Sequence, residues 1–163
     1  MRALVLSALV LAGCGATIDE PSVCKTLRDQ TVPSAEGLKA ISVPLAVDLR
    51  PELKALGVTQ GSAELSQVTL HVDDGVSDLS FLTSLRVNLL QPSDGGEIEL
   101  VDYEGVTAPT TLVLDGGGGD ILPDALAGPL SLQLTLAGDL PETTWHADVT
   151  VCLAARADLG LNL

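Results

Sequence analysis

The sequence is poor in aromatic and basic residues. Phe81, Tyr103 and Trp145 are its three aromatic side chains, and eight Lys and Arg stand against 22 Asp and Glu. Stacking platforms for sugars or bases need exposed rings, so the aromatic scarcity argues against them. The formal net charge of −14 repels nucleic acid and anionic lipid headgroups. We therefore expect no nucleic-acid partner and an aliphatic core built mainly from Leu and Val.

Recognisable catalytic and cofactor motifs are also missing. The sequence has no Gly-x-Ser-x-Gly elbow and no Ser-x-x-Lys motif. The glycine run 116–119 is followed by Asp120 rather than by Lys and Ser or Thr, so it is not a phosphate-binding loop. We expect a protein that is not an enzyme and has no cofactor; a hydrolase is the least favoured alternative.

The first 14 residues have the pattern of an export signal. Arg2 is followed by the apolar stretch 3–12, which as a helix would reach only about 15 Å, roughly half of a bilayer's hydrocarbon core. The stretch ends in Leu11-Ala12-Gly13-Cys14. This tetrapeptide resembles the lipobox of bacterial lipoproteins, an aliphatic residue and two small residues before a cysteine.

The resemblance implies that the signal 1–13 is cleaved and that Cys14 receives a diacylglyceryl group and usually an acyl chain. Because two or three chains bind a bilayer far more firmly than one, such a protein stays on the membrane. The alternative is an ordinary secretory signal in which Cys14 is incidental. Gly15 stands where an Asp would resemble an inner-membrane retention signal, so we expect an outer-membrane protein facing the periplasm or the cell surface.

The two other cysteines, Cys24 and Cys152, form an even pair in a chain expected to be exported, which predicts a disulfide. The alternatives are two buried free thiols or a metal pair, but no His or Cys neighbour has ligand spacing. Cys152 alternates with Val151 and Leu153, so it should point away from the apolar face of its strand. We therefore expect the Cys24 segment beside or over that outer side.

The body of the chain alternates apolar and polar residues with the period of half-buried strands. Seven such segments span 41–49, 68–72, 85–89, 97–100, 111–114, 130–136 and 145–153, and an eighth candidate spans 23–32. Turn-forming residues separate them, and short helical turns are expected at 51–57 and 121–127. We predict a signal at 1–13, a lipidated tether at 14–22 and one domain at 23–163. Its expected fold is an immunoglobulin-like or Greek-key antiparallel β-sandwich, with a small β-barrel as the alternative.

Two acidic stretches are weak candidates for calcium binding. Asp115 and Asp120 flank the glycine run, and Asp73, Asp74 and Asp78 form a second group. Neither has the alternate acids and closing Glu of an EF-hand, so solvated turns are the simpler interpretation.

The two histidines, His71 and His146, fall on the expected outer faces of strands, without a third ligand for zinc.

The leading functional hypothesis is a lipid-anchored, non-catalytic envelope module that binds another envelope protein. The alternative is a module that binds a small hydrophobic ligand or a lipid between its sheets.

Overall fold

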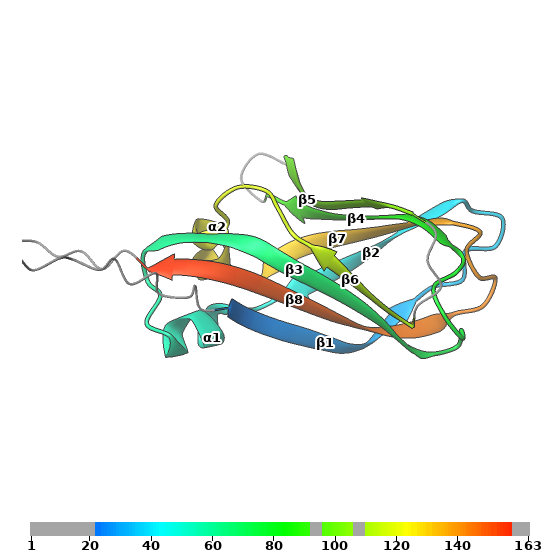
Figure 1. Cartoon of the computed structure of the whole chain (residues 1–163), viewed down its shortest axis with the longest axis horizontal. Coiled ribbons are helices and arrows are strands. Elements are labelled where there is room, and N and C mark those ends of the chain that lie inside the picture. The colour runs from blue at the N-terminus through cyan, green and yellow to red at the C-terminus, as the bar shows by residue number, and fades with distance from the viewer. Residues whose placement is uncertain (1–21, 92–95, 106–109, 158–163) are drawn as a thin grey trace, which may run out of the picture.

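The computed structural model describes residues 22–91, 96–105 and 110–157. These residues form eight strands and two short helices (Figure 1). The elements are, in chain order, β1 (Ser22–Val32), β2 (Ala40–Val47), α1 (Arg50–Ala55), β3 (Gly61–Asp74), β4 (Leu82–Leu90), β5 (Glu97–Glu104), β6 (Thr111–Asp115), α2 (Leu122–Ala127), β7 (Leu130–Gly138) and β8 (Trp145–Ala157).

The strands make two antiparallel four-stranded sheets, ordered β1-β8-β3-β6 and β2-β7-β4-β5. Strands whose numbers add up to nine are neighbours: β1 pairs with β8, β2 with β7, β3 with β6 and β4 with β5. This is the order of a jelly roll, a double-sheet member of the Greek-key sandwiches. The expected antiparallel β-sandwich is therefore confirmed. Because no described strand pairs across the two sheets, the alternative of a small barrel is not the fold.

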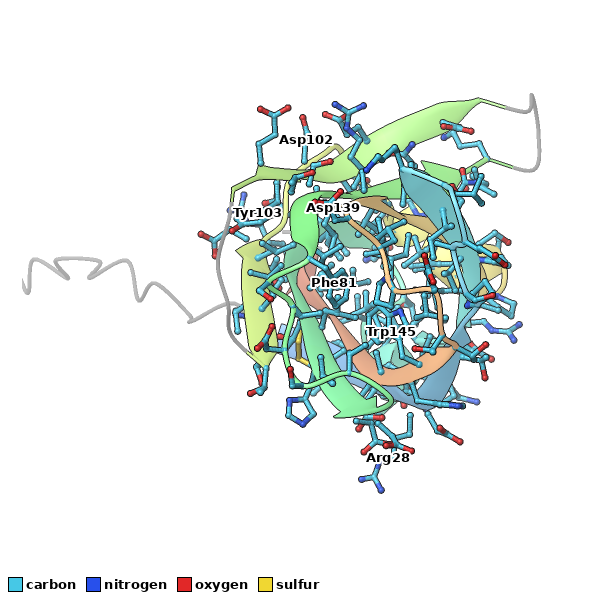
Figure 2. All side chains as sticks on the ribbon, turned by 90° about the vertical axis from the view of Figure 1, so that its right-hand side faces the viewer. Arg28, Phe81, Asp102, Tyr103, Asp139 and Trp145 are labelled. Carbon is cyan, nitrogen blue, oxygen red and sulfur yellow. A yellow bond between two sulfur atoms is a disulfide. The ribbon has the colours of Figure 1, made fainter. Side chains whose placement is uncertain are left out.

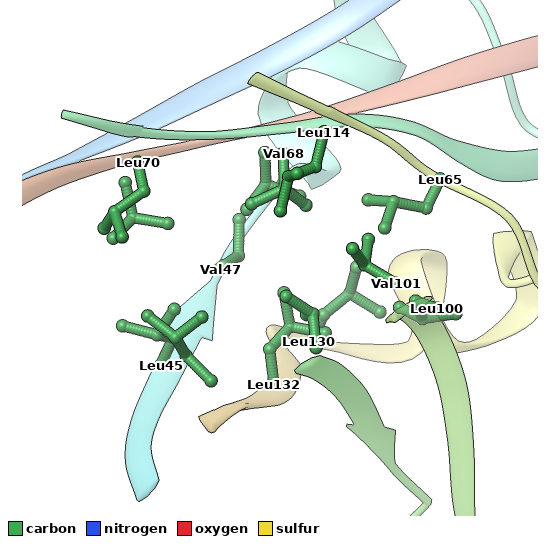
Figure 3. Close-up of a cluster of buried hydrophobic side chains, with 14 of the residues drawn as sticks. Leu45, Val47, Leu65, Val68, Leu70, Leu100, Val101, Leu114, Leu130 and Leu132 are labelled. Atoms are coloured by element: carbon green, nitrogen blue, oxygen red, sulfur yellow. The ribbon is translucent and has the colours of Figure 1, made fainter. Parts of the chain in front are cut away.

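The core follows from the alternation in the sequence. Apolar side chains of both sheets interdigitate between the layers, as Figure 3 shows for residues of β2, β3, β5, β6 and β7. Trp145 is completely buried, and its ring meets that of Phe81 edge to face with centroids 5.4 Å apart. Figure 2 shows both rings in the interior and Arg28 and Asp102 outside. Aliphatic side chains thus fill the space between the sheets.

Two strands depart from simple alternation. In β5, a bulge opposite Val87 and Asn88 leaves both Leu100 and Val101 buried. The alternation of the expected strand 41–49 continues to Leu49. In the structure β2 ends at Val47, and Leu49 is the buried N-cap residue of α1. Leu49 is therefore buried as the alternation predicts, but its backbone leads into the helix and not along the strand.

Three of the four edge strands, β1, β2 and β5, are covered or interrupted. Pro44 lies in β2, where a residue without an N–H suits an edge strand. β1 is interrupted by a bulge at Asp29 and contacts α1 through Lys25. At β5, the Gly117 N–H donates to the Leu100 carbonyl over 2.9 Å. These features reduce strand pairing between molecules.

The domain has two distinct ends (Figure 1). We call the helical end the one with α1, α2, the start of β1 and the end of β8, where Ser22 pairs with Ala154. We call the loop end the opposite one, formed by 33–39, 75–81 and 139–144. No helix among the described residues is long and apolar enough to cross a membrane.

Candidate functional site

The expected disulfide is present. Cys24 on β1 and Cys152 on β8 are bonded and are directly opposite each other in the ladder. Cys152 lies on the outer face of its sheet, as its register predicts, and the neighbouring β1 leaves it 5% exposed. The bridge therefore ties the first strand of the domain to its last. Cys14 and the rest of the expected signal lie outside the described residues.

The first pair of calcium candidates does not converge. Asp115 is exposed at the end of β6. Asp120 is used by the backbone, because its Oδ1 accepts the N–H groups of Ala63 and Leu122 at 2.9 and 3.0 Å. These bonds fix the start of α2 against β3. Asp120 thus has a structural role that explains its position without an ion.

The start of the glycine run 116–119 is packed against both sheets, although the composition of the run indicates a pliable loop. The Gly116 N–H donates to Ser66 O over 2.9 Å, and a Cβ on Gly116 would lie only 2.4 Å from Leu65 O. Gly118 has φ +96°, a conformation that favours glycine. The chain crosses from one sheet to the other along this run; Gly116 has no room for a side chain and Gly118 has a positive φ, whereas Gly119 has open space around it.

The second acidic group serves turns at the loop end. The Ser80 N–H donates to Asp78 Oδ1 over 2.9 Å, and hydrogen bonds from the side chain and then the backbone of Ser80 lower the pKa of Asp78. Asp74 Oδ1 accepts the N–H of its neighbour Gly75 over 2.8 Å. Among the described residues, no group of three or more His, Cys, Asp or Glu side chains is placed to hold a metal ion.

The two histidines lie on the outer face of the same sheet, as expected, but their rings point apart. The Nδ1 of His146 on β8 is 2.7 Å from Asp29 Oδ1 on β1, whereas the Nδ1 of His71 on β3 is 2.6 Å from Thr111 Oγ1 on β6. In the order β1-β8-β3-β6, these partners lie on opposite sides of the β8–β3 pair. The imidazoles therefore do not form a joint site.

The loop end has a shallow groove that the sequence did not reveal. It measures about 270 Å³ and lies between the turns 33–39 and 139–144. Leu38 lines it with 55% of its surface exposed, although leucine is normally buried. No periodicity distinguishes Leu38, because it stands in a turn.

The turns around Leu38 are firmly linked. The Ala35 N–H donates to Pro141 O over 3.0 Å, and the Gly138 N–H to Lys39 O over 3.0 Å. The Lys39 ammonium lies 2.7 Å from Asp139 Oδ1 and lowers the pKa of that carboxyl. The exposed Leu38 is thus held by a hydrogen-bonded frame, a property of preorganised contact surfaces.

Charge is distributed unevenly along the long axis. The segments 33–39, 73–81 and 139–144 contain six carboxylates against one basic residue, Lys39. Four of the seven basic residues among the described ones lie at the helical end: Lys25, Arg50, Lys54 and Arg156. Three of them face a carboxylate within 4.0 Å. The helical end (22–25, 48–64, 115–129 and 154–157) also holds six carboxylates and has a formal charge of −2, whereas the loop end together with the last two residues of β3 has −5 and is therefore the more acidic.

Comparison with known proteins adds little. No protein-family model matches the chain, and no curated protein matches its sequence. Among solved structures, FLHE is 11% identical with a TM-score of 0.39, over 83% of this chain and 97% of that one. A protein of the infectious bursal disease virus Gx strain is 14% identical with a TM-score of 0.34, over 100% of this chain and 39% of that one. Among the described residues, the structure thus shows an eight-stranded antiparallel sandwich.

Proposed function

We propose that this protein is a lipid-anchored lipoprotein of a bacterial envelope, and that it is a binding module rather than an enzyme. The anchor is Cys14, in the lipobox-like Leu11-Ala12-Gly13-Cys14. Ser22, where β1 begins, is at the helical end. The seven residues 15–21 can span at most about 25 Å when extended, so the helical end stays near the membrane.

The observation that carries the proposal is the polarity of the domain. The chain enters at the less acidic end, which has four of the seven described basic residues, and the more acidic loop end with Leu38 lies opposite. An anionic membrane repels the loop end, and this repulsion fades over about 8–10 Å at physiological ionic strength. Both the anchor at Cys14 and the acidity of the loop end favour an orientation in which the groove at Leu38 faces away from the lipid. An envelope partner can reach the groove there.

The interior supports surface binding over the alternative of a hydrophobic ligand between the sheets. Leu45, Leu70, Leu114 and Leu132 are among the side chains that fill this space (Figure 3). A ligand there would have to displace packed core residues. Native mass spectrometry of the purified protein should accordingly show no non-covalently bound lipid besides the covalent lipid expected at Cys14.

Anchoring is tested by comparing the wild type with Cys14→Ala in a bacterial host that processes lipoproteins. The wild type should start at Cys14 with added lipid mass and sediment with membranes, whereas Cys14→Ala should carry no lipid and leave the membrane fraction. The double variant Cys24→Ala/Cys152→Ala should keep the lipid. An unmodified Cys14 in the mature wild type would refute the anchor.

Partner binding is tested by photo-crosslinking from single sites in intact cells. A crosslinker at Leu38 should give one dominant protein adduct, whereas a crosslinker at Val113 on the outer face of β6 should not. The two positions are matched, because their side chains are 55% and 54% exposed. Equal adducts from both sites, or none from Leu38, would contradict the proposed contact surface.

A further inference from the structure

Three Asp–Gly dipeptides occur in the chain, at Asp74, Asp94 and Asp115. An Asp–Gly bond can rearrange spontaneously, because the glycine nitrogen has little steric cover and can attack the aspartyl side chain. Asp94 lies outside the described residues. The other two are presented very differently by the fold, and this difference points to one site of covalent modification.

In the Asp74–Gly75 pair, the glycine nitrogen is in direct contact with the aspartate carboxylate. Asp74 is the exposed last residue of β3, and its Oδ1 is 2.8 Å from the nitrogen of Gly75. Cγ is only one bond beyond that oxygen, so the carbon to be attacked is near the nucleophile. The Gly75 N–H donates to the carboxylate of Asp74, and it is absent from the ladder that β3 forms with β8.

In the Asp115–Gly116 pair, the glycine N–H is instead bonded to the neighbouring strand. The Gly116 N–H donates to Ser66 O over 2.9 Å, in continuation of the pairing between β6 and β3. A Cβ would fit neither on Gly116, against Leu65, nor on Gly75, against Trp145, so it is the hydrogen bond of the glycine nitrogen that distinguishes the two pairs. Attack on the Asp115 side chain would first require this part of the sheet to open.

We propose that Asp74 is a site of isoaspartate formation in the folded protein and that Asp115 is protected. The Gly75 nitrogen bonds to Asp74 Cγ and loses its proton, and the carboxyl hydroxyl leaves as water, which gives a succinimide. Water then opens the ring. Cleavage between the nitrogen and Cγ restores aspartate, and cleavage between the nitrogen and the main-chain carbonyl carbon leaves the peptide linked through the side chain.

The rearrangement has a structural consequence at the loop end. It inserts the Asp74 Cβ into the main chain directly before Gly75. A Cβ on Gly75 would already lie 2.8 Å from Trp145 Cα, so the turn has no spare room there. Isoaspartate at position 74 should therefore loosen the contact between this turn and Trp145, the chain's single tryptophan.

The experiment ages the folded wild type in mildly acidic buffer at physiological temperature. Peptides are then analysed by electron-transfer fragmentation, which distinguishes isoaspartate from aspartate. The Asp74 peptide should convert about tenfold faster than the Asp115 peptide, as expected when positioning decides the rate. In concentrated urea the two rates should become similar. Equal rates in the folded protein, or conversion at Asp74 in urea alone, would overturn the proposal.

Matched variants connect the chemistry with the turn. Asp74→Glu should abolish the modification, because a longer side chain does not readily close the five-membered ring, and Asp115→Glu should leave it unchanged. Ageing should shift tryptophan emission to the red in the wild type and in Asp115→Glu, but not in Asp74→Glu. Isoaspartate at position 74 without an emission change would refute the structural consequence.

Discussion

Cys24 and Cys152 are 128 residues apart in the sequence but face each other on neighbouring antiparallel strands, with their Cα atoms 4.0 Å apart. Cys24 is the third residue of β1, an edge strand that pairs only with β8. The bridge therefore binds the edge strand to a strand inside the sheet, close to the point where the chain enters the domain.

Removal of this disulfide should destabilise the domain. In the chain-entropy model, a bridge that closes a loop of this length contributes about 4–5 kcal/mol, since it restricts the unfolded chain. The double variant Cys24→Ala/Cys152→Ala should lose a comparable amount of unfolding free energy in urea titrations. Wild type under reducing conditions should unfold at the same urea concentration as the variant. A loss below about 1 kcal/mol would show that the entropic effect is offset.

Alanine substitutions at the two ends of the glycine run 116–119 test whether its start is packed and its end is open. Gly116→Ala should lower the free energy of unfolding by about 1–3 kcal/mol, because the new Cβ collides with Leu65 O. Gly119→Ala should change it by less than about 0.5 kcal/mol, since no atom lies within 4 Å of the added Cβ. Chemical denaturation of both variants measures the difference. Similar values would mean that the run is a loose loop.

The core should respond strongly to truncation, and the sheet surface should not. Leu132 is 1% exposed between the sheets (Figure 3), and Leu132→Ala should cost about 2–5 kcal/mol. Val113→Ala, at a side chain 54% exposed, should stay within about 0.5 kcal/mol of the wild type. Thermal unfolding followed by circular dichroism can rank the two. A small effect at Leu132 would contradict the tight interior.

Acid should weaken the link between β2 and α1. A hydrogen bond from Arg50 lowers the pKa of Asp48 from 3.8 to about 2. A carboxyl group with a lower pKa in the folded state stabilises the fold above its unfolded pKa, and this contribution is lost as the pH falls from about 4 to 2. Asp48→Asn should therefore flatten the dependence of stability on pH in that window. An unchanged slope would show that Asp48 titrates normally.

Strand formation and its faces could be predicted from the sequence because they depend on local alternation. Trp145 and His146, for example, are buried and outward-facing respectively, as their register predicts. The bulge at Leu100 and the turn after Val47 could not be predicted in this way. The bulge depends on the register that β5 takes against β4, and at Leu49 the burial period continues although the backbone has already turned into α1.

Some features of the candidate site could likewise be predicted from the sequence, and others could not. The pairing of Cys24 with Cys152 could be predicted because only two cysteines remain in the expected mature body beyond Cys14. The groove at Leu38 could not, because its walls come from turns about 100 residues apart. The separation of His71 from His146 likewise depends on Thr111 and Asp29, on strands at opposite edges of the sheet.

By itself, the sequence determined an all-β domain with an aliphatic core, its short helices and a disulfide, because periodicity, turn chemistry and cysteine number act locally or by elimination. The tertiary structure decided the order of the strands, the packing role of the glycine run and the polarity between the helical end and the loop end. These depend on which distant segments meet, and that is set by the simultaneous burial of both sheets rather than by any one segment.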